Sequence, residues 1–227
     1  MATGGIELNE ISELYEKKIS CNVCGEEFVT SKVRTSKLRM VKRDADFMTY
    51  YEGENPLLYN VFVCPHCGYA AMEEKFNHIN FSEKKMIKNT ITPKWNKRDF
   101  SGKRTVSDGI EVYKLALITG EVLDYKSYDL ANICLRICWL NRMADDEDEE
   151  KRFAILARDL YKYSYTNESI NMEETALAYL IGELSRRMGE KGEALSWYNT
   201  ALQNPSVKNN AALENMIREQ WQIAKEG

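Results

Sequence analysis

Two pairs of cysteines have the spacing that binds a metal ion. Cys21 and Cys24 stand in the sequence Cys-Asn-Val-Cys-Gly, and Cys64 and Cys67 stand in Cys-Pro-His-Cys-Gly about 40 residues later. A C-x-x-C turn can present two thiolates to one ion at about 2.3 Å, and the following glycine relieves crowding in the turn. Because four protein ligands leave no position for water or substrate, we expect these cysteines to bind one structural zinc ion.

The two cysteine turns are further apart than the roughly 15 to 20 residues usual for a compact site. Each doubling of loop length costs only about 0.6 kcal/mol, whereas structural zinc binding contributes about 10 to 16 kcal/mol. The insert can therefore be a small sheet carried between the turns. Redox-active C-x-x-C pairs and unrelated buried thiols are the alternatives. His66 lies inside the second turn, and we expect it to face solvent rather than replace a cysteine.

Other groups suited to catalysis are sparse. The chain holds two histidines, His66 and His78, and no serine or cysteine is set beside a base, so nucleophilic and acid–base mechanisms have little to use. There is no glycine-rich phosphate loop. Asp44 and Asp46 could bind a cation from one face of a strand, but we prefer to interpret them as part of a solvated turn. An enzyme whose cleft is assembled from distant residues is the third hypothesis for function.

One stretch rich in Lys and Arg is the best candidate for contact with nucleic acid. Charge interleaved with aromatic rings suits phosphate contact combined with base stacking, although alternating Lys and Arg also solvate sheet edges. The charge balance argues against a dedicated nucleic-acid binder, since residues 1–110 hold 17 Lys or Arg against 15 Asp or Glu, and the rest hold 14 against 20. The stretch comprises Lys32, Arg34, Lys37, Arg39, Lys42 and Arg43, with Tyr50, Tyr51, Tyr59 and Phe62 nearby.

Short strands and helices must position the cysteine turns. Apolar residues at near-helical spacing favour a short helix or a docking arm over residues 7–18. Alternating stretches between Phe28 and Val63, with a turn signal at residues 53–56, predict two to four short strands.

Two short helices should follow the second cysteine turn. We expect one over residues 69–76 and another that is capped by Ser82 and ended by Pro93. The polar segment 94–104 is interpreted as a connection between domains. Residues 1–104 are thus predicted to form a zinc-ribbon-like domain with short strands and helices.

The second half of the chain repeats a helical pattern. Residues 178–205 resemble a tetratricopeptide repeat along its full length. Turns are expected near residues 120, 145, 167, 189 and 204. The second-helix pattern is a small residue, a tyrosine four positions later and another small residue three positions after that. It occurs at Gly109, Tyr113 and Ala116, at Ala157, Tyr161 and Ser164, and at Ala194, Tyr198 and Ala201.

The fold class that follows is α+β. A small zinc-bound β domain should precede an all-α tetratricopeptide-like array over residues 105–227. A first-helix pattern also recurs, since Ala131, Cys134, Ile137 and Cys138 align with Ala178, Ile181, Leu184 and Ser185. We therefore expect Cys134 and Cys138 to be small buried hydrophobes. The acidic run at residues 145–150 is expected to be a solvated loop.

Helical arrays of this kind bind peptides or partner proteins along a concave surface made by their first helices. The repeat register places six residues on that surface: Asn132, Arg136, Trp139, Tyr179, Glu183 and Arg186. The alternative is that the array is only a scaffold, with a C-terminal helix over residues 211–224 that caps or fills the groove.

Composition limits where the protein acts. Hydrophobic residues make up 44% of the chain and aromatic residues 11%, which is enough for a packed core. The N-terminal residues do not resemble a signal peptide, and no apolar run is long enough to cross a membrane. Six cysteines without a secretory signal favour a reducing compartment. We therefore expect a cytoplasmic protein without a membrane partner.

Several of these motifs together resemble one bacterial family, known mainly from Firmicutes and catalogued as domain of unknown function twenty-two twenty-five. The resemblance covers most of the chain, from the first cysteine turn into the repeats. It implies a zinc-ribbon-like domain followed by tetratricopeptide-like helices in a bacterial cytoplasmic protein, and it implies no activity or substrate. It is carried by the two cysteine turns, residues 32–37, Asp44 with Asp46, Asn55-Pro56, Tyr59 and residues 64–70.

The leading hypothesis for function is a non-enzymatic zinc-containing adaptor. In it, zinc holds the N-terminal sheet, and the helical repeats present a surface to a protein or peptide partner. The rival is a nucleic-acid-binding protein that uses the basic strands next to the zinc site. The sequence does not specify the partner or the oligomeric state.

Overall fold

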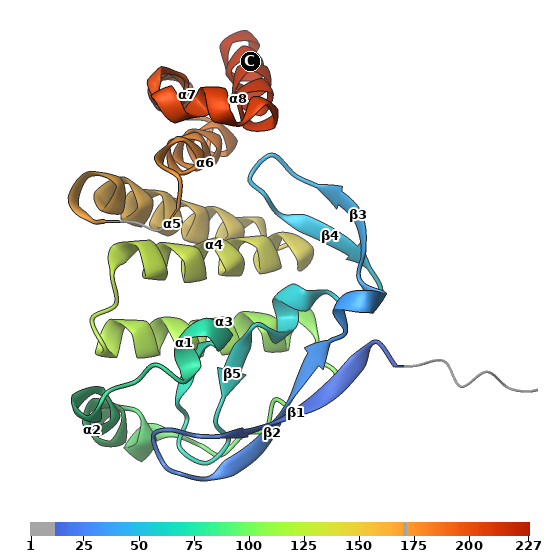
Figure 1. Cartoon of the computed structure of the whole chain (residues 1–227), viewed down its shortest axis with the longest axis vertical. Coiled ribbons are helices and arrows are strands. Elements are labelled where there is room, and N and C mark those ends of the chain that lie inside the picture. Colours follow the sequence, from blue (N-terminus) through green and yellow to red (C-terminus); the bar gives the residue numbers. More distant parts are fainter. Residues whose placement is uncertain (1–11, 170–171) are drawn as a thin grey trace, which may run out of the picture.

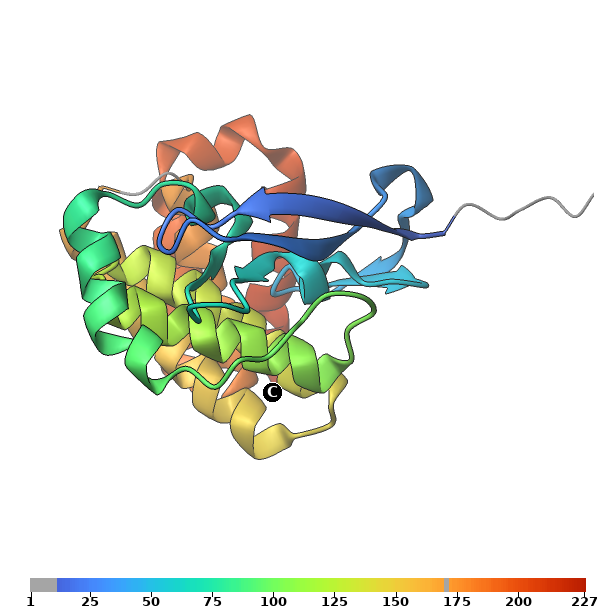
Figure 2. The same cartoon turned by 90° about the horizontal axis from the view of Figure 1, so that it is seen from below.

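The computed structural model describes residues 12–169 and 172–227. Within them, eight α-helices accompany three separate two-stranded antiparallel sheets. The helices from residue 106 onward are stacked along the long axis of the molecule, and the last two lie side by side at one end (Figure 1). In the view turned by 90°, the blue hairpin of residues 14–33 lies above the green helices of residues 106–143 (Figure 2). The expected combination of helices and short strands is thus confirmed.

The first sheet is a hairpin of β1 (Leu14–Ser20) and β2 (Glu27–Val33), paired from Leu14 opposite Val33 to Ser20 opposite Glu27. The helix expected over residues 7–18 is therefore wrong from Leu14 onward, and residues 7–11 lie outside the described residues. Apolar positions in so short a segment fit either period. Residues 14–20 form a strand because pairing with β2 satisfies the backbone donors and acceptors of both segments.

The second and third sheets confirm the strands expected between Phe28 and Val63. The strands β3 (Arg39–Arg43) and β4 (Thr49–Glu52) form a ribbon, and β5 (Val61–Val63) pairs with β6 (Ala70–Met72). Short 3-10 turns occupy Thr35–Lys37 and Pro56–Tyr59. The helix expected over 69–76 is only half correct, since α1 is Glu73–Phe76 and β6 precedes it. Pairing with β5 overrides helix formation at these three buried residues.

The helix α2 (Phe81–Thr90) confirms the second short helix, but Asn80 caps it rather than Ser82. The Asn80 side chain accepts from the backbone N–H of Glu83, and the Glu83 carboxylate accepts from the backbone N–H of Asn80. This reciprocal pair is a capping box. Pro93 follows in a 3-10 turn over Thr92–Lys94.

The segment 94–104 is firmly held despite its lack of long elements. Arg104 is buried and donates hydrogen bonds to the carbonyl oxygens of Leu58, Val61 and Phe100. The largest core also contains Val61 and Val112, from either side of residue 104. Described residues on both sides of position 104 therefore contribute to one core, and the domain boundary itself stays a prediction.

From residue 106 onward the chain is helical, as expected. A 3-10 turn spans Pro205–Asn209. The turn expected near Gly120 begins only after Val122, because the helix continues through the glycine. The α-helices are α3 (Val106–Val122), α4 (Ser127–Met143), α5 (Glu147–Asn167), α6 (Glu174–Arg187), α7 (Lys191–Gln203) and α8 (Ala211–Glu226).

The acidic run 145–150 is not a solvated loop. Asp146 caps α5, with its carboxylate accepting from the backbone N–H of Glu149, and residues 147–150 form the first turn of that helix. Negative side chains are stabilising at a helix N-terminus because they face its free N–H groups. The acidic residues therefore start the helix rather than lengthen the turn before it.

The recurrent tyrosines and small residues lie in the helical core. Tyr113, Tyr161 and Tyr198 are all fully buried. Cys134 and Cys138 are buried in α4, which confirms their expected role as core residues. Among the described residues, no helix combines the length and the apolar character that a membrane crossing requires.

Candidate metal centre

Each cysteine pair lies in the turn of a β-hairpin. The first turn joins β1 to β2, with the N–H of Cys21 donating to the Glu26 carbonyl at 2.9 Å and that of Gly25 to the Cys21 carbonyl at 2.8 Å. The second joins β5 to β6 with the same pattern: the N–H of Cys64 donates to the Tyr69 carbonyl, and the N–H of Gly68 donates to the Cys64 carbonyl. Gly25 and Gly68 have φ of +86° and +78°, a region that favours glycine. The two turns are therefore built alike.

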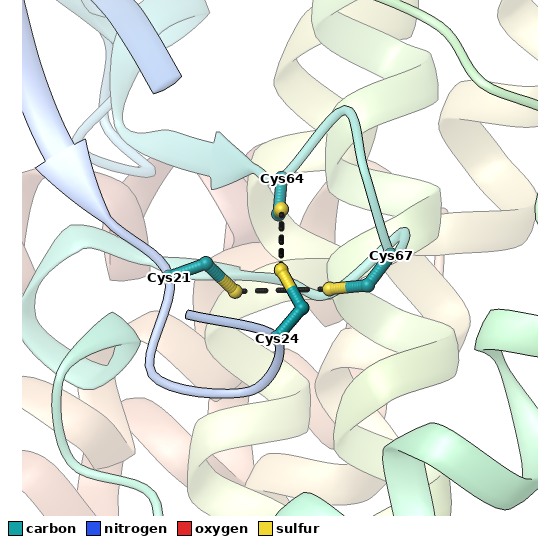
Figure 3. Close-up of side chains that lie close together, drawn as sticks. All are labelled: Cys21, Cys24, Cys64 and Cys67. Atoms are coloured by element: carbon teal, nitrogen blue, oxygen red, sulfur yellow. Dashed lines mark hydrogen bonds between the residues drawn. The ribbon is translucent and has the colours of Figure 1, made fainter. Parts of the chain in front are cut away.

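The four sulfur atoms converge from the two turns, as Figure 3 shows. The Sγ atoms of Cys21 and Cys67 are 3.7 Å apart, those of Cys24 and Cys64 are 3.6 Å apart, and all four lie within 4.8 Å of one another. A tetrahedral ion with metal–sulfur bonds of about 2.3 Å would have sulfur–sulfur edges of about 3.8 Å. These distances are also far longer than the roughly 2.05 Å of a disulfide. The arrangement can thus hold a metal ion.

Burial and mutual hydrogen bonding shape the chemistry of the thiols. Cys21, Cys64 and Cys67 are buried and Cys24 is half-buried. Hydrogen bonds from Cys64 and then Cys67 lower the pKa of the Cys21 thiol, and the same contacts with Cys21 raise the pKa of Cys64 to about 12 and that of Cys67 further still. A divalent cation can replace the shared protons and stabilise all four sulfurs as thiolates.

The second turn is held against the segment that follows α2. The indole N–H of Trp95 donates to the Pro65 carbonyl at 2.9 Å, and the Thr92 hydroxyl donates to the Cys67 carbonyl at 3.1 Å. A Cβ atom on Gly68 would lie 2.7 Å from the Trp95 ring. Only glycine therefore fits beneath this indole, while His66 is exposed in the same turn, as expected.

A second arrangement connects the β3–β4 ribbon to the helices. We call residues 44–48, between β3 and β4, the ribbon tip. The carboxylate of Asp46 is fully buried and accepts from Arg142 Nη2 at 2.6 Å and from the Trp139 indole N–H at 3.1 Å. The Tyr179 hydroxyl donates to the Ala45 carbonyl at 2.8 Å. The ribbon tip is thus bound across α4 and α6.

The interpretation of Asp44 and Asp46 as a solvated turn is therefore wrong. Asp44 accepts from Arg142 Nη1 at 3.2 Å and from the Tyr50 hydroxyl at 2.9 Å, and Arg187 lies within ion-pair distance of both aspartates. A carboxylate is stable in a buried position only when a cation pairs with it. Arg142 and Arg187 supply the positive charge that allows Asp46 to be buried. The sequence did not reveal this arrangement, because Arg142 lies 96 residues after Asp46 and Arg187 lies 141 residues after it (187 − 46), and no local pattern connects them.

The six residues expected on the concave surface have different surroundings. Trp139 and Tyr179 contact the ribbon tip, and Glu183 is fully buried, where it accepts from Tyr198, Arg186 and Arg187. Asn132 and Arg136 instead line a cavity between α4 and the segment 72–78. The C-terminal helix α8 packs on α7 and also contacts α6, and the ribbon tip covers the expected surface at Trp139 and Tyr179.

The basic stretch is divided between structural and exposed positions. Lys32 forms an ion pair with Glu73, and Arg34 donates to the Ser12 carbonyl. Tyr59 and Phe62 are buried in the two cores. On β3, by contrast, every residue is exposed, including Arg39, Lys42 and Arg43. The structure therefore leaves Lys37 and the ribbon part of the stretch open to solvent.

Comparisons with known proteins agree with the resemblance found in the sequence. One relative is an uncharacterized protein from Borreliella burgdorferi (strain ATCC 35210 / DSM 4680 / CIP 102532 / B31), which is 28% identical over 203 residues, covering 77% of this chain and 72% of the relative. No solved structure matches the chain. Residues 14–224 match the family described as an uncharacterized protein conserved in bacteria (DUF2225). The match includes both cysteine turns and all eight helices apart from the last two residues of α8, so the chain belongs to this bacterial family.

Proposed function

We propose that the protein is a non-enzymatic, zinc-containing adaptor that binds a protein or peptide partner through its helices. One observation carries the proposal: α4 and α6 hold the ribbon tip, an acidic turn of the same chain, through Trp139, Arg142 and Tyr179. Aromatic and basic side chains that hold an acidic turn of the same chain can hold an acidic peptide of a partner by the same contacts. The neighbouring part of α4, at Asn132 and Arg136, remains beside an open cavity.

Zinc is the metal we propose for the four cysteines. Four thiolates at tetrahedral spacing favour zinc, and they leave no open position for water or substrate. The ion would then hold the β1–β2 and β5–β6 hairpins together, which supports a structural role. A reducing compartment such as the cytoplasm keeps the thiols available for the metal.

We further propose that the helices form tetratricopeptide-like repeats. The pairs α4 with α5 and α6 with α7 pack most closely, and α3 supplies a preceding second helix. Gly182 permits the close approach within the last pair, because a Cβ there would lie 2.7 Å from the Tyr198 ring. Tyr113 and Tyr161 occupy the equivalent buried positions in α3 and α5.

The test is an affinity pulldown from the native host with the zinc-loaded full chain as bait. The double variant Asn132→Ala with Arg136→Ala should lose the partners that the wild type recovers. Arg218→Ala is the matched control, since Arg218 is exposed on α8 and pairs only with Glu214. If the double variant and the control recover the same partners as the wild type, this surface is not the adaptor site.

A nucleic-acid-binding function is the second candidate, favoured by the exposed Arg39, Lys42 and Arg43 of β3. It requires binding to a labelled oligonucleotide that weakens steeply as salt rises, because phosphate neutralisation releases counterions. Absence of binding at about 50 mM salt would dismiss it.

A further inference from the structure

Arg136 differs from the other arginines on the two groove-facing helices. Arg142, Arg186 and Arg187 each donate to at least one carboxylate. Arg136 is half-buried and donates one hydrogen bond, from Nη1 to the Asn132 carbonyl at 2.8 Å, and no carboxylate of residues 12–169 or 172–227 lies within 4.0 Å of it. A guanidinium has five N–H donors, so most of those of Arg136 remain for a ligand.

A larger cavity lies on one side of Arg136. Its volume is about 460 Å³, within the range of ligand sites, and Asn132 and His78 also line it. The Asn132 amide is held in place, since its nitrogen donates to the Tyr128 carbonyl and its oxygen accepts from the Tyr161 hydroxyl. The Asn132 side chain that lines this cavity is therefore held by two hydrogen bonds, while its backbone carbonyl accepts from Arg136.

A smaller cavity lies on the other side of Arg136. Its volume is about 150 Å³, below the roughly 300 Å³ of a complete ligand site, so it suits one side chain. Aromatic groups line it, namely Phe47 and Tyr51 of the ribbon and Trp139 of α4. Because Trp139 donates to Asp46, the anchored ribbon tip builds one wall of this cavity and fixes the indole against it. An apolar or aromatic side chain fits these surroundings.

The other charges of the larger cavity select the kind of anion. Lys75 is paired with Asp129 at 2.9 Å, and Glu74 adds a second negative charge to the lining. A doubly charged phosphate or a nucleic-acid backbone would be repelled by these acids. A single carboxylate can form two parallel hydrogen bonds with Arg136 and carries only one charge.

We propose that the groove along α4, centred on Arg136, binds a peptide through one carboxylate, with a neighbouring apolar or aromatic side chain in the smaller cavity. The carboxylate is either the C-terminus of the peptide or an acidic side chain. This inference rests on the proposed adaptor function and names the chemistry of its partner. Arg136 is the anion-binding residue, the backbone carbonyl of Asn132 holds its guanidinium, and Trp139 lines the cavity for the neighbouring side chain.

The test uses three acetylated tetrapeptides that differ only in charge. All have the order Gly-Ser-X-Phe: one has Asp at X and an amidated end, one has Asn at X and a free carboxylate, and one has Asn at X and an amidated end. Each is titrated into the zinc-loaded, nitrogen-15-labelled full chain. The indole N–H signal of Trp139 reports binding, while those of Trp95, Trp197 and Trp221 report the integrity of the fold.

At least one charged peptide should shift the Trp139 signal saturably, and the neutral peptide should bind at least tenfold more weakly. Which charged peptide binds identifies the source of the carboxylate. Arg136→Gln should weaken binding at least tenfold, and Arg218→Gln should leave it unchanged. Equal binding of charged and neutral peptides, no binding of any, or wild-type affinity in Arg136→Gln would overturn the carboxylate assignment. The adaptor proposal would still stand if the pulldown shows loss of partners in the Asn132 and Arg136 double variant.

Discussion

Nη2 of Arg142 donates a hydrogen bond to Oδ2 of Asp46, 96 residues earlier in the chain, at 2.6 Å. The Asp46 side chain has no exposed surface, and that of Arg142 is 14% exposed. This buried ion pair joins the β3–β4 ribbon to α4. It also occupies part of the surface that the repeat pattern marks as a binding groove, so the ribbon and the helices act as one unit.

Removing the Asp46 carboxylate should destabilise the protein. Asp46→Ala removes a buried carboxylate from the Trp139 indole and from Arg142, which keeps Asp44 and Glu150, so the loss should be about 1–3 kcal/mol. Urea unfolding measures the change. The control is Glu52→Ala on β4, whose 4.0 Å contact with Arg39 is exposed and should contribute less than about 1 kcal/mol. Equal losses in the two variants would contradict the structural role of the ribbon tip.

The contribution of Asp44 should depend on pH. Burial opposes its ionisation, but hydrogen bonds from Tyr50 and Lys42 and the charge of Arg187 outweigh burial and lower its pKa. A lowered pKa in the folded state gives stability that is present above the unfolded value of about 3.9 and is lost as pH falls below it. Unfolding free energies of wild type and Asp44→Asn should therefore differ at pH 7 and converge toward pH 2. A constant difference at every pH would argue against this.

Two helical glycines should respond oppositely to alanine. Gly182 in α6 has the Tyr198 ring in the space of a Cβ, so Gly182→Ala should cost about 1–3 kcal/mol. Gly192 in α7 has no atom within 4 Å of a Cβ, so Gly192→Ala should be neutral or gain up to about 1 kcal/mol. Thermal unfolding of both variants checks this. A loss in both would show that packing on Tyr198 is not the cause.

Two buried cysteines should differ in their effect on the metal. Cys64→Ala removes a ligand and should release zinc, whereas Cys134→Ala changes only the core of α4 and should retain it. Hydrogen exchange should then accelerate in β1, β2, β5 and β6 of Cys64→Ala, with protection retained in α6 and α7. Similar exchange patterns in the two variants would mean that no metal anchors the hairpins.

Local chemistry made some of the structure predictable. The C-x-x-C-G spacing located both turns because the turn, the glycine and the thiolates all follow from a few adjacent residues. The recurring tyrosines and small residues located the helices of the second half. The strand at Leu14 was missed because its partner β2, rather than its own periodicity, determines its conformation.

Long-range pairing explains what the sequence did not reveal. Asp46 looks like a surface residue until Arg142 and Trp139 lie beside it, and no local pattern connects them. Arg136 was placed on the binding surface from its helical register alone. Unlike Arg142, it has no carboxylate partner among the residues that the structure describes, and no local sequence pattern reveals this.

Native mass measurement of the purified full chain, prepared without chelator, tests the central claim most directly. The account predicts a folded species heavier than the denatured chain by one zinc ion, less the protons that the ion displaces, and loss of that mass in Cys64→Ala. Equal masses under native and denaturing conditions would contradict a metal centre formed by Cys21, Cys24, Cys64 and Cys67.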